Sequence, residues 1–395
     1  MIVQGLLDTD LYKLTQQQAV CRLFPTAEVM YKLFNRGGHE LSEEQAQIID
    51  DAISEIESIE LSNKEAEYLK SLRYIDPQYV DFLKGYRFDR NEIKFIYEGP
   101  KNWNLFVSGP WYRTILWETP LLAIVSSVIT AEPMTKSTLL FQKELAEYKA
   151  KGLGSADIKF AEFGTRRRVS YQLQKTILQS LMENTNTLVG TSNVSLAKTF
   201  DLVPVGTHAH EWYMFHAAKY GYKFANKRAM DSWCHVYDGD LGIALTDTFT
   251  SDIFFKDFSM KYAKLFDGIR QDSGDPIKLA YKAIEKYESL GINPEYKTIV
   301  FSDSISSIDK AIDIKKALKN RIDCSFGIGT YLTNDLYKRA PNIAMKMIWA
   351  RDKDFQTQPT IKISDSKGKS MGPQMEIQRC MKDYHMEDRM NSLTK

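Results

Sequence analysis

From about residue 133 onward, short apolar runs alternate with amphipathic segments, and this alternation limits the folds open to the chain. The runs that read as strands cover residues 158–163, 187–189, 202–205, 242–246, 266–269, 298–301, 324–328 and 344–349. Segments with helical spacing, such as residues 275–290 and 304–318, separate most of them. Strands that alternate with helices are typical of parallel βα units. About eight such units predict an α/β fold with an irregular (β/α) barrel, and a doubly wound open sheet is the alternative.

The residues before this alternation have a different character. Residues 41–72 are rich in Glu, Ile and Leu at helical spacing and end near the Asp76-Pro77 turn. Residues 91–98 and 103–108 read as short strands. We therefore expect a smaller α+β domain over residues 1–125, packed with the C-terminal segment 350–395, and an α/β barrel domain over residues 126–349.

Composition narrows the classes of partner and compartment. A net charge of +1 gives no bulk attraction for nucleic acid or an anionic membrane. The four cysteines, Cys21, Cys234, Cys324 and Cys380, are scattered without a CxxC pair, which is typical of reduced thiols. The first residues lack the layout of a signal peptide, and the longest apolar run, 120–131, is too short to span a bilayer. We expect a soluble cytoplasmic protein.

Polar motifs follow nearly every predicted strand. They are FGTR at 163–166, GTSN at 190–193, GTHAHE at 206–211, TDTFT at 246–250, RQDSGD at 270–275, SDS at 302–304 and GIGT at 327–330. Each alone could be only a helix cap, because Gly, Ser, Thr and Asp are favoured there. The carboxyl ends of parallel strands converge on one face, where active sites lie. Seven motifs that contain Arg, His and carboxylates therefore predict one active site.

The turn at 205–212, VGTHAHEW, carries the strongest chemical signal in the chain. It holds two of the six histidines, His208 and His210. Near neutral pH, imidazole can attack phosphorus, transfer a proton or bind a metal. Asp247, Asp272 and Asp275, which follow two later strands, could bind Mg²⁺ held mainly by substrate phosphates, or could orient a histidine.

Two other strand-end motifs are candidates for binding anions. Gly327, Gly329 and Thr330 can present backbone N–H groups and a hydroxyl to a phosphate. Ser302 and Asp303 could hold a second anion or a ribose diol, or could simply cap the following helix.

Arginines supply candidates for binding acidic ligands. Arg166, Arg167 and Arg168 open the segment after a predicted strand. Arg166 is expected to face the strand ends and a polyphosphate, with solvated charge as the simpler interpretation of the others. Arg270 follows a buried strand, where an unpaired charge is costly. It therefore requires an anion, either Asp272 or the carboxylate of a ligand.

In their order and spacing, these motifs resemble the nicotinate phosphoribosyltransferase family. The residues that carry the resemblance are DTDLYKLTQ at 8–16, FGTRRR, GTSN, GTHAHEW, TDTFTSDIFF, IRQDSGDP and FGIGTYLTN, from residue 6 to about residue 350. GTxAHEW together with RxDSGD is the most specific part. The resemblance implies a type II phosphoribosyltransferase fold, an irregular α/β barrel with an N-terminal domain, and a homodimer with active sites at the subunit interface.

The same resemblance implies a reaction. Nicotinate and phosphoribosyl diphosphate (PRPP) give nicotinate mononucleotide and diphosphate in the salvage branch of NAD biosynthesis. ATP hydrolysis is coupled to it through a phosphohistidine, with Mg²⁺ accompanying the phosphates and no resident metal. His210 matches the phosphorylated histidine, and Asp247 and Asp272 match carboxylates near it. Arg166 and Thr330 match positions that contact the phosphates of PRPP.

The resemblance also implies residues for nicotinate. Thr207 and Arg270 match positions that hold it, with Arg270 facing its carboxylate. Phe163 matches an aromatic side chain that stacks on the pyridine ring, and Tyr12 matches one that covers the ring from the neighbouring subunit. Pairing with Arg270 would favour nicotinate over nicotinamide, because a neutral amide satisfies the charge less well.

Four alternatives remain open on the sequence. His208 stands where the family commonly has another residue, which leaves open which imidazole carries phosphate. The pair His208-x-His210 could also ligate zinc in a barrel hydrolase, which would need further histidines on later strands. Nicotinamide phosphoribosyltransferase shares much of this motif order. A barrel that only binds nucleotides or a partner would have no need for Arg, His and Asp at its strand ends.

Overall fold

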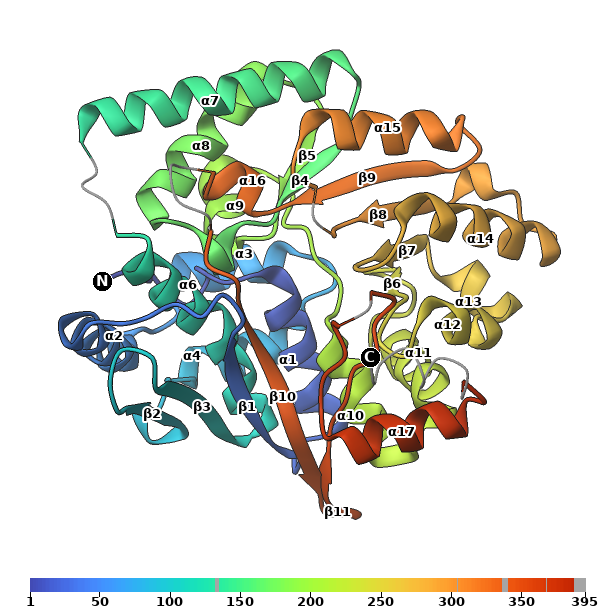
Figure 1. The fold of residues 1–395 in the computed structure, drawn as a ribbon, viewed down its shortest axis with the longest axis horizontal. Helices are drawn as coiled ribbons and strands as arrows, with labels where there is room; N and C mark the ends of the chain where they lie inside the picture. Colours follow the sequence, from blue (N-terminus) through green and yellow to red (C-terminus); the bar gives the residue numbers. More distant parts are fainter. Residues whose placement is uncertain (132–134, 304, 336–339, 367, 387–395) are drawn as a thin grey trace.

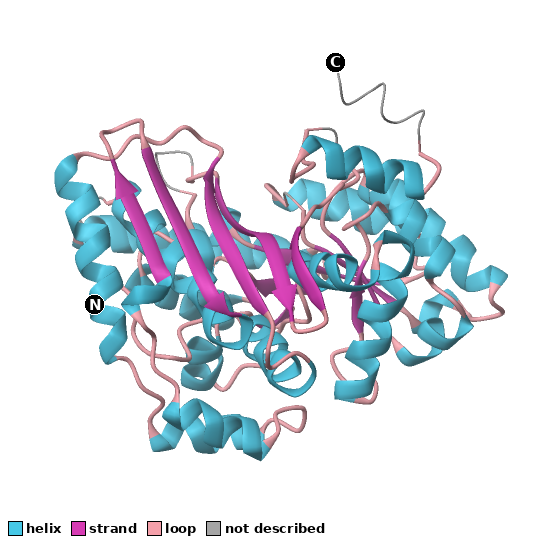
Figure 2. Cartoon of the chain, turned by 90° about the horizontal axis from the view of Figure 1, so that it is seen from below, coloured by secondary structure: helices cyan, strands magenta, loops and turns pink. Residues whose placement is uncertain are grey.

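The computed structural model describes residues 1–131, 135–303, 305–335, 340–366 and 368–386, and it places them around two β-sheets. One sheet has five strands and is antiparallel, and the other has six strands and is parallel. Figure 1 shows the parallel strands β4–β9 with their helices on one side of the molecule and β1, β2, β3, β10 and β11 on the other. Figure 2 shows the long antiparallel strands beside the shorter parallel ones, with helices around both.

The antiparallel sheet has the order β11-β10-β1-β3-β2. Its strands are β1 (Glu28–Asn35), β2 (Ile93–Tyr97), β3 (Trp103–Pro110), β10 (Ile343–Asp352) and β11 (Phe355–Pro359). In β1, buried and partly exposed residues alternate, so one face of the sheet packs on the core. The helices of this part are α1 (Leu11–Leu23), α2 (Glu43–Glu55), α3 (Asn63–Ser71), α4 (Pro77–Gly85), α5 (Trp111–Thr114) and α6 (Glu118–Ile129).

The region of helical spacing at 41–72 contains two α-helices, α2 and α3. A capping box starts each of them, with Ser42 and Gln45 at α2 and with Ser62 and Glu65 at α3. Each serine accepts a backbone N–H and each third residue bonds back to the cap, which satisfies donors that would otherwise be unpaired. The second cap therefore begins a separate helix within this region.

The parallel sheet has the order β5-β4-β9-β8-β7-β6. Its strands are β4 (Phe160–Glu162), β5 (Leu188–Thr191), β6 (Ile243–Leu245), β7 (Gly268–Gln271), β8 (Thr298–Phe301) and β9 (Asp323–Ile328). Its helices are α7 (Lys136–Ser155), α8 (Tyr171–Asn184), α9 (Val194–Phe200), α10 (His210–Tyr220), α11 (Tyr222–Tyr237), α12 (Ser251–Asp257), α13 (Met260–Leu265), α14 (Pro276–Ser289), α15 (Ile308–Leu318) and α16 (Thr330–Thr333). The last helix of the described residues, α17 (Gln374–Asp383), follows β10 and β11 of the antiparallel sheet.

An extended segment at 203–208 joins the two edge strands of the parallel sheet. On one side, Thr191 of β5 donates to the carbonyl of Val203 over 3.2 Å and accepts from the N–H of Val205 over 2.9 Å. On the other side, the N–H of Leu245 in β6 lies 3.5 Å from Nε2 of His208. The segment thus closes the sheet without a regular ladder, and the prediction of an irregular α/β barrel is confirmed.

Two of the predicted strands differ from the structure. The run at 202–205 forms only an isolated bridge between Thr191 and Pro204, because proline has no N–H to donate to a ladder. The run at 344–349 lies in β10, which pairs with β1 in the antiparallel sheet and not in the barrel. Its residues alternate between buried and partly exposed, as expected for a strand with one covered face, whereas buried parallel strands are continuously apolar.

The C-terminal segment contacts both parts of the molecule. Residues up to 359 extend the antiparallel sheet, but the N–H of Ile363 then donates to the carbonyl of Thr248 over 2.8 Å, at the end of a barrel strand. The hydroxyl of Tyr222 on α11 donates to Glu376 on α17 over 2.7 Å. The domain boundary near residue 125 stays a prediction. In the described part of the chain, no helix is both long and apolar enough to cross a bilayer.

Candidate active site

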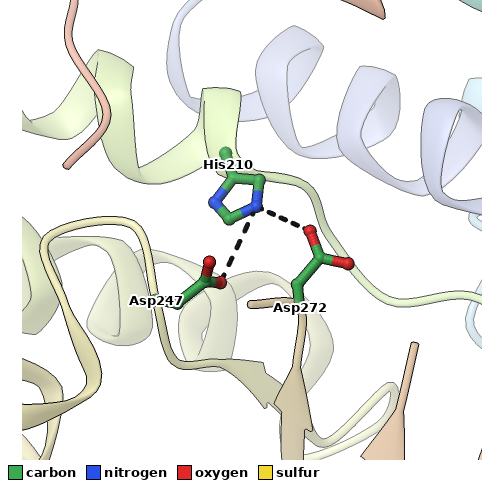
Figure 3. A group of neighbouring side chains, drawn as sticks. All are labelled: His210, Asp247 and Asp272. Atoms are coloured by element: carbon green, nitrogen blue, oxygen red, sulfur yellow. Dashed lines mark hydrogen bonds and ion pairs between the residues drawn. The ribbon is translucent and has the colours of Figure 1, made fainter. Parts of the chain in front are cut away.

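His210 is the first residue of α10, at the carboxyl-terminal edge of the parallel sheet, and it is buried. Its Nδ1 lies 3.0 Å from the hydroxyl of Thr248. Its Nε2 lies 2.8 Å from Oδ2 of Asp272 and 3.7 Å from Oδ1 of Asp247, as Figure 3 shows. Three predicted residues therefore meet: His210 follows the extended segment 203–208, and Asp247 and Asp272 follow β6 and β7.

Lys362 also contacts this imidazole, although it comes from the C-terminal segment. Its Nζ lies 2.8 Å from Nε2 of His210 and 3.2 Å from Oδ2 of Asp247. Burial, and then the charge of Lys362, lower the pKa of His210 to about 4, against the opposing effect of the two carboxylates. At neutral pH the imidazole is therefore uncharged and has a lone pair available for attack.

Both carboxylates are held in their ionised form. Burial alone would raise the pKa of Asp247, but Lys362 and His210 outweigh it, and the hydroxyl of Ser273 donates to this carboxylate. Burial likewise opposes the ionisation of Asp272, but Arg270, His210 and Lys362 lower its pKa well below the usual range. Asp272 is 29 % exposed, whereas Asp247 is fully covered.

Of the potential metal ligands around His210, only the partly exposed carboxylate of Asp272 is suited to bind Mg²⁺. Ligand atoms of His210, Asp247 and Asp272 all lie within 4.8 Å of one another. The ammonium of Lys362 already contacts two of these groups, so a metal ion between them would meet a like charge. Asp272 is the carboxylate with open surface, and carboxylate oxygen suits an Mg²⁺ ion that is held mainly by phosphates.

His208 does not share this site. Its ring is buried, its Nε2 lies 3.0 Å from the hydroxyl of Tyr213, and its centroid lies 4.7 Å from that of Trp233. Burial lowers its pKa well below the usual value, so it is a neutral packing residue at the seam of the barrel. In the described part of the chain, the one group of three potential metal ligands includes His210 and no second histidine, which is contrary to the zinc-hydrolase alternative.

Arg270 and Thr207 each present a polar atom that lacks a partner. Nη2 of Arg270 lies 3.9 Å from Oδ2 of Asp272, which is too long for a hydrogen bond. Nε of Arg270 and the hydroxyl oxygen of Thr207 are buried and have no hydrogen-bond partner among the described residues. Buried polar groups are almost always paired, so these two atoms indicate a site for a polar ligand.

The FGTR and GIGT motifs lie side by side at the ends of β4 and β9. The N–H of Phe163 donates to the carbonyl of Ile328 over 2.8 Å. A Cβ atom at Gly327 would lie 2.4 Å from the ring of Phe163, so this ring packs directly on the glycine backbone. The side chain of Phe163 is only partly buried, which leaves part of the ring free to contact a planar ligand. Gly329 and Thr330 continue from this contact into α16.

The three arginines after β4 have three different environments. Nε of Arg166 lies 3.1 Å from Asp10, and the guanidinium carbon lies 5.4 Å from the ring centroid of Tyr12. Arg167 is exposed, in agreement with the simpler interpretation of its charge. Arg168 is fully buried, and its two terminal nitrogens donate to Asp8 over 2.6 and 2.7 Å. This structural ion pair was not expected from the sequence.

Tyr12 and Ser302 make contacts that the sequence did not define. The hydroxyl of Tyr12 donates to Glu118 of the same chain over 3.3 Å. The hydroxyl of Ser302 donates to Oδ1 of Asp272 over 2.9 Å, so it orients this carboxylate, and the cap of the next helix is Ser307 instead. Asp303 accepts from Lys369 over 3.0 Å.

Sequence reasoning missed three lysines of the C-terminal half, Lys346, Lys362 and Lys369. Burial, and then the charge of Lys362, lower the pKa of Lys346 to about 8. The charges of Glu118 and Asp272 act on this pKa in the opposite direction. The available signal was the Gly-, Ser- and Lys-rich stretch at 362–370, which resembles the other strand-end motifs.

Comparison with known proteins gives one consistent result over nearly the whole chain. A family model described as the nicotinate phosphoribosyltransferase (NAPRTase) family matches residues 158–391, and the model of the N-terminal domain of that family matches residues 7–126. The chain is 42% identical over 379 residues to the nicotinate phosphoribosyltransferase of Chromohalobacter salexigens, covering 94% of this chain and 95% of the relative. It is 42% identical over 389 residues to that of Desulforapulum autotrophicum, covering 96% and 98%.

Solved structures agree with these relatives. The crystal structure of nicotinate phosphoribosyltransferase from Porphyromonas gingivalis superposes with a TM-score of 0.92 at 39% identity, covering 96% of this chain and 99% of that one. The enzyme from Vibrio cholerae superposes with a TM-score of 0.92 at 31% identity, covering 100% and 96%. The relatives carry the name of the nicotinate enzyme, not that of the nicotinamide enzyme.

Proposed function

The chain belongs to the nicotinate phosphoribosyltransferase family, and we propose that it couples the joining of nicotinate and PRPP to ATP hydrolysis through a phosphate carried on His210. The transferase activity, and with it a role in NAD biosynthesis, follows from the family. The coupling rests on one observation: His210 is a buried, neutral imidazole held by Thr248 and Asp272 at the strand ends. We assign the reaction to salvage of free nicotinate.

The phosphoryl step uses the lone pair of His210. A ring nitrogen forms a bond to the γ-phosphorus of ATP while the bond from that phosphorus to the β,γ-bridging oxygen breaks, and ADP leaves. Asp272, which lies 2.8 Å from Nε2, stabilises the positive charge that develops on the ring. Later attack by water on the phosphorus forms an O–P bond while the N–P bond breaks, which releases phosphate and restores the imidazole. The added negative charge beside the phosphate site changes the affinities for substrates and products.

Nicotinate is proposed to bind between Phe163 and Arg270. The unpaired Nε of Arg270 and the partly exposed ring of Phe163 offer a charged donor and a flat apolar surface. Arg270 pairs with the carboxylate of nicotinate, while the ring of Phe163 stacks on the pyridine. Thr207 supplies a further polar contact from its unpartnered hydroxyl.

PRPP is proposed to bind where cations gather at the strand ends. Arg166 and Lys346 approach from β4 and β10, while Gly327, Gly329 and Thr330 present backbone and hydroxyl groups. Transfer of the ribosyl group passes through an oxocarbenium-like state, so the protein positions the ring nitrogen and neutralises the departing diphosphate. Mg²⁺ bound to Asp272 together with the phosphates would supply further neutralisation.

We also propose that two copies form a homodimer in which Tyr12 covers the nicotinate site of the neighbouring subunit. Mixing Tyr12→Ala with Arg270→Ala then restores activity, because one of the two sites in a mixed dimer receives both intact residues. Verified mixed dimers that stay inactive would instead assign Tyr12 to the site of its own chain, where it already lies beside Arg166.

The four free cysteines fit a reducing compartment, and we propose the cytoplasm.

Turnover assays test the coupling directly. With nicotinate and PRPP, added ATP is expected to accelerate the formation of nicotinate mononucleotide and to yield ADP alongside it. Acid-labile phosphate from γ-labelled ATP is expected on the peptide that contains His210. A rate that does not respond to ATP would remove the coupling and leave the transferase activity standing.

A further inference from the structure

A fully buried ammonium lies between two glutamates next to the active site. Lys13 on α1 has no exposed side-chain surface, and its Nζ lies 2.5 Å from Oε2 of Glu118 and 2.5 Å from Oε1 of Glu211. Burial opposes its charge, but the two carboxylates outweigh this effect and raise the pKa of Lys13, so the ammonium persists. A buried charge of this kind is costly unless it is paired, and such pairs are weak evidence for stability alone.

The two glutamates lie beside different parts of the site, Glu118 beside Arg166 and Glu211 beside His210. Oε1 of Glu118 accepts from Tyr12 over 3.3 Å and lies 3.4 Å from Nη1 of Arg166, at the proposed PRPP end. Glu211 directly follows His210 at the start of α10. Lys13 is therefore the one side chain of the described residues that forms ion pairs with both glutamates.

Other residues of α1 hold the same two regions. Gln16 donates to Glu211 over 2.8 Å and accepts the N–H of Ala209 just before His210. The hydroxyl of Thr15 donates to the carbonyl of Thr207 over 3.2 Å. Asp10, which precedes α1, lies 3.1 Å from Nε of Arg166. The first turns of α1 thus form a rigid connection between the phosphate-binding arginine and the turn that carries the reactive histidine.

We infer that Lys13 is a positioning residue that fixes Arg166 relative to His210, so that phosphorylation of His210 is transmitted to the PRPP site through Glu211, Lys13 and Glu118. This inference rests on the proposed ATP coupling. Lys13 takes no part in the chemistry. Because its ammonium is bonded to both glutamates, the distance between Glu211 and Glu118 stays fixed. When His210 gains a doubly charged phosphate, the start of α10 moves, and Glu118 and Arg166 move with it.

The test compares Lys13→Met, Lys13→Arg and Glu211→Gln with the wild-type chain. The measured quantity is the amount of ADP formed per nicotinate mononucleotide, together with KM for PRPP with and without ATP. In Lys13→Met and Glu211→Gln, this ratio is expected to rise at least about fivefold. Two coupled sites typically change the affinity of one another by this factor or more, and that factor is lost when the connection is broken. The rate of transfer without ATP is measured for each variant, so that a direct effect on Arg166 and PRPP binding is separated from the loss of coupling. Lys13→Arg keeps the charge, and it is expected to fold and to show an intermediate ratio.

Lys219→Met is the matched control. Lys219 lies on the same helix as His210, is nearly buried, and pairs with Asp352 and Asp354 away from the site. Its loss is expected to lower stability without changing the ratio of ADP to product. If Lys13→Arg and Glu211→Gln fold and keep the wild-type ratio, the inference is wrong while the coupling itself stands. If the wild-type chain shows no response to ATP, both the coupling and the inference are wrong.

Discussion

Replacing His210 with alanine is expected to abolish phosphate labelling and all stimulation by ATP, while weak transfer without ATP remains. The imidazole is the nucleophile of the proposed phosphoryl step, and no other described side chain has its contacts with Thr248, Asp272 and Lys362. Arg270 and Arg166, the charged groups proposed for nicotinate and PRPP, follow other strands and stay in place. The measurements are label from γ-labelled ATP, the rate of ADP release, and product formation with and without ATP.

His235→Ala is the control for this loss. His235 is an exposed histidine on α11, so its removal is expected to leave labelling and ATP stimulation unchanged. Label that persists in His210→Ala would move the phosphate to another residue. The nearest histidine in sequence, His208, is sealed between Tyr213 and Trp233, and label found there would contradict the site described above.

Replacing Arg270 with alanine is expected to raise KM for nicotinate by about 10- to 100-fold, because a hydrogen bond to a charged group contributes about 1.5–3 kcal/mol. KM for PRPP is expected to change far less. Nε of Arg270 has no partner in the described part of the chain, and Asp272 lies beyond hydrogen-bond distance, so the guanidinium is available to a ligand carboxylate. Steady-state kinetics with each substrate varied in turn measures both constants.

Two comparisons separate this role from a general disturbance of the site. Arg270→Lys keeps the charge but loses the planar fork, so an intermediate KM for nicotinate is expected. Phosphate labelling of His210 in Arg270→Ala reports whether Asp272 still supports the phosphoryl step, because Arg270 lowers the pKa of that carboxyl group. Equal increases of both Michaelis constants would contradict the assignment of Arg270 to nicotinate.

The barrel and the cluster at His210 could be predicted from the sequence because local pattern determines both. Parallel strands are short apolar runs, and their carboxyl ends must converge, so Asp247 and Asp272 were expected near His210 before any distance was known. The same reasoning misplaced residues 344–349, since an apolar run reads alike in either sheet. The pairing of β10 with β1 depends on residues more than 300 positions apart, as in Arg351 opposite Glu28.

Long-range pairing also explains which site residues the sequence did not reveal. Lys362 reaches His210 only because the segment after β11 turns back onto the loop at Thr248, a contact that no local motif encodes. The burial of Arg168 depends on Asp8, and the burial of Lys13 depends on Glu118 and Glu211. From the sequence alone, solvated charge was the simpler interpretation for Arg168, and no local pattern indicated that Lys13 or Lys362 is buried against a partner. Charged side chains are rarely buried without a partner, and these partners are distant in sequence.

The position of Lys362 has a consequence for how the protein is made. A ribosome works from the N-terminus, so every strand of the parallel sheet emerges before Lys362 does. A chain made only as far as the parallel sheet would hold His210 beside two acidic groups without the ammonium of Lys362, which is the second cause, after burial, of the low pKa of this imidazole. In the proposed mechanism, the surroundings of the histidine that accepts phosphate are therefore completed last, after all strands of the parallel sheet have been made.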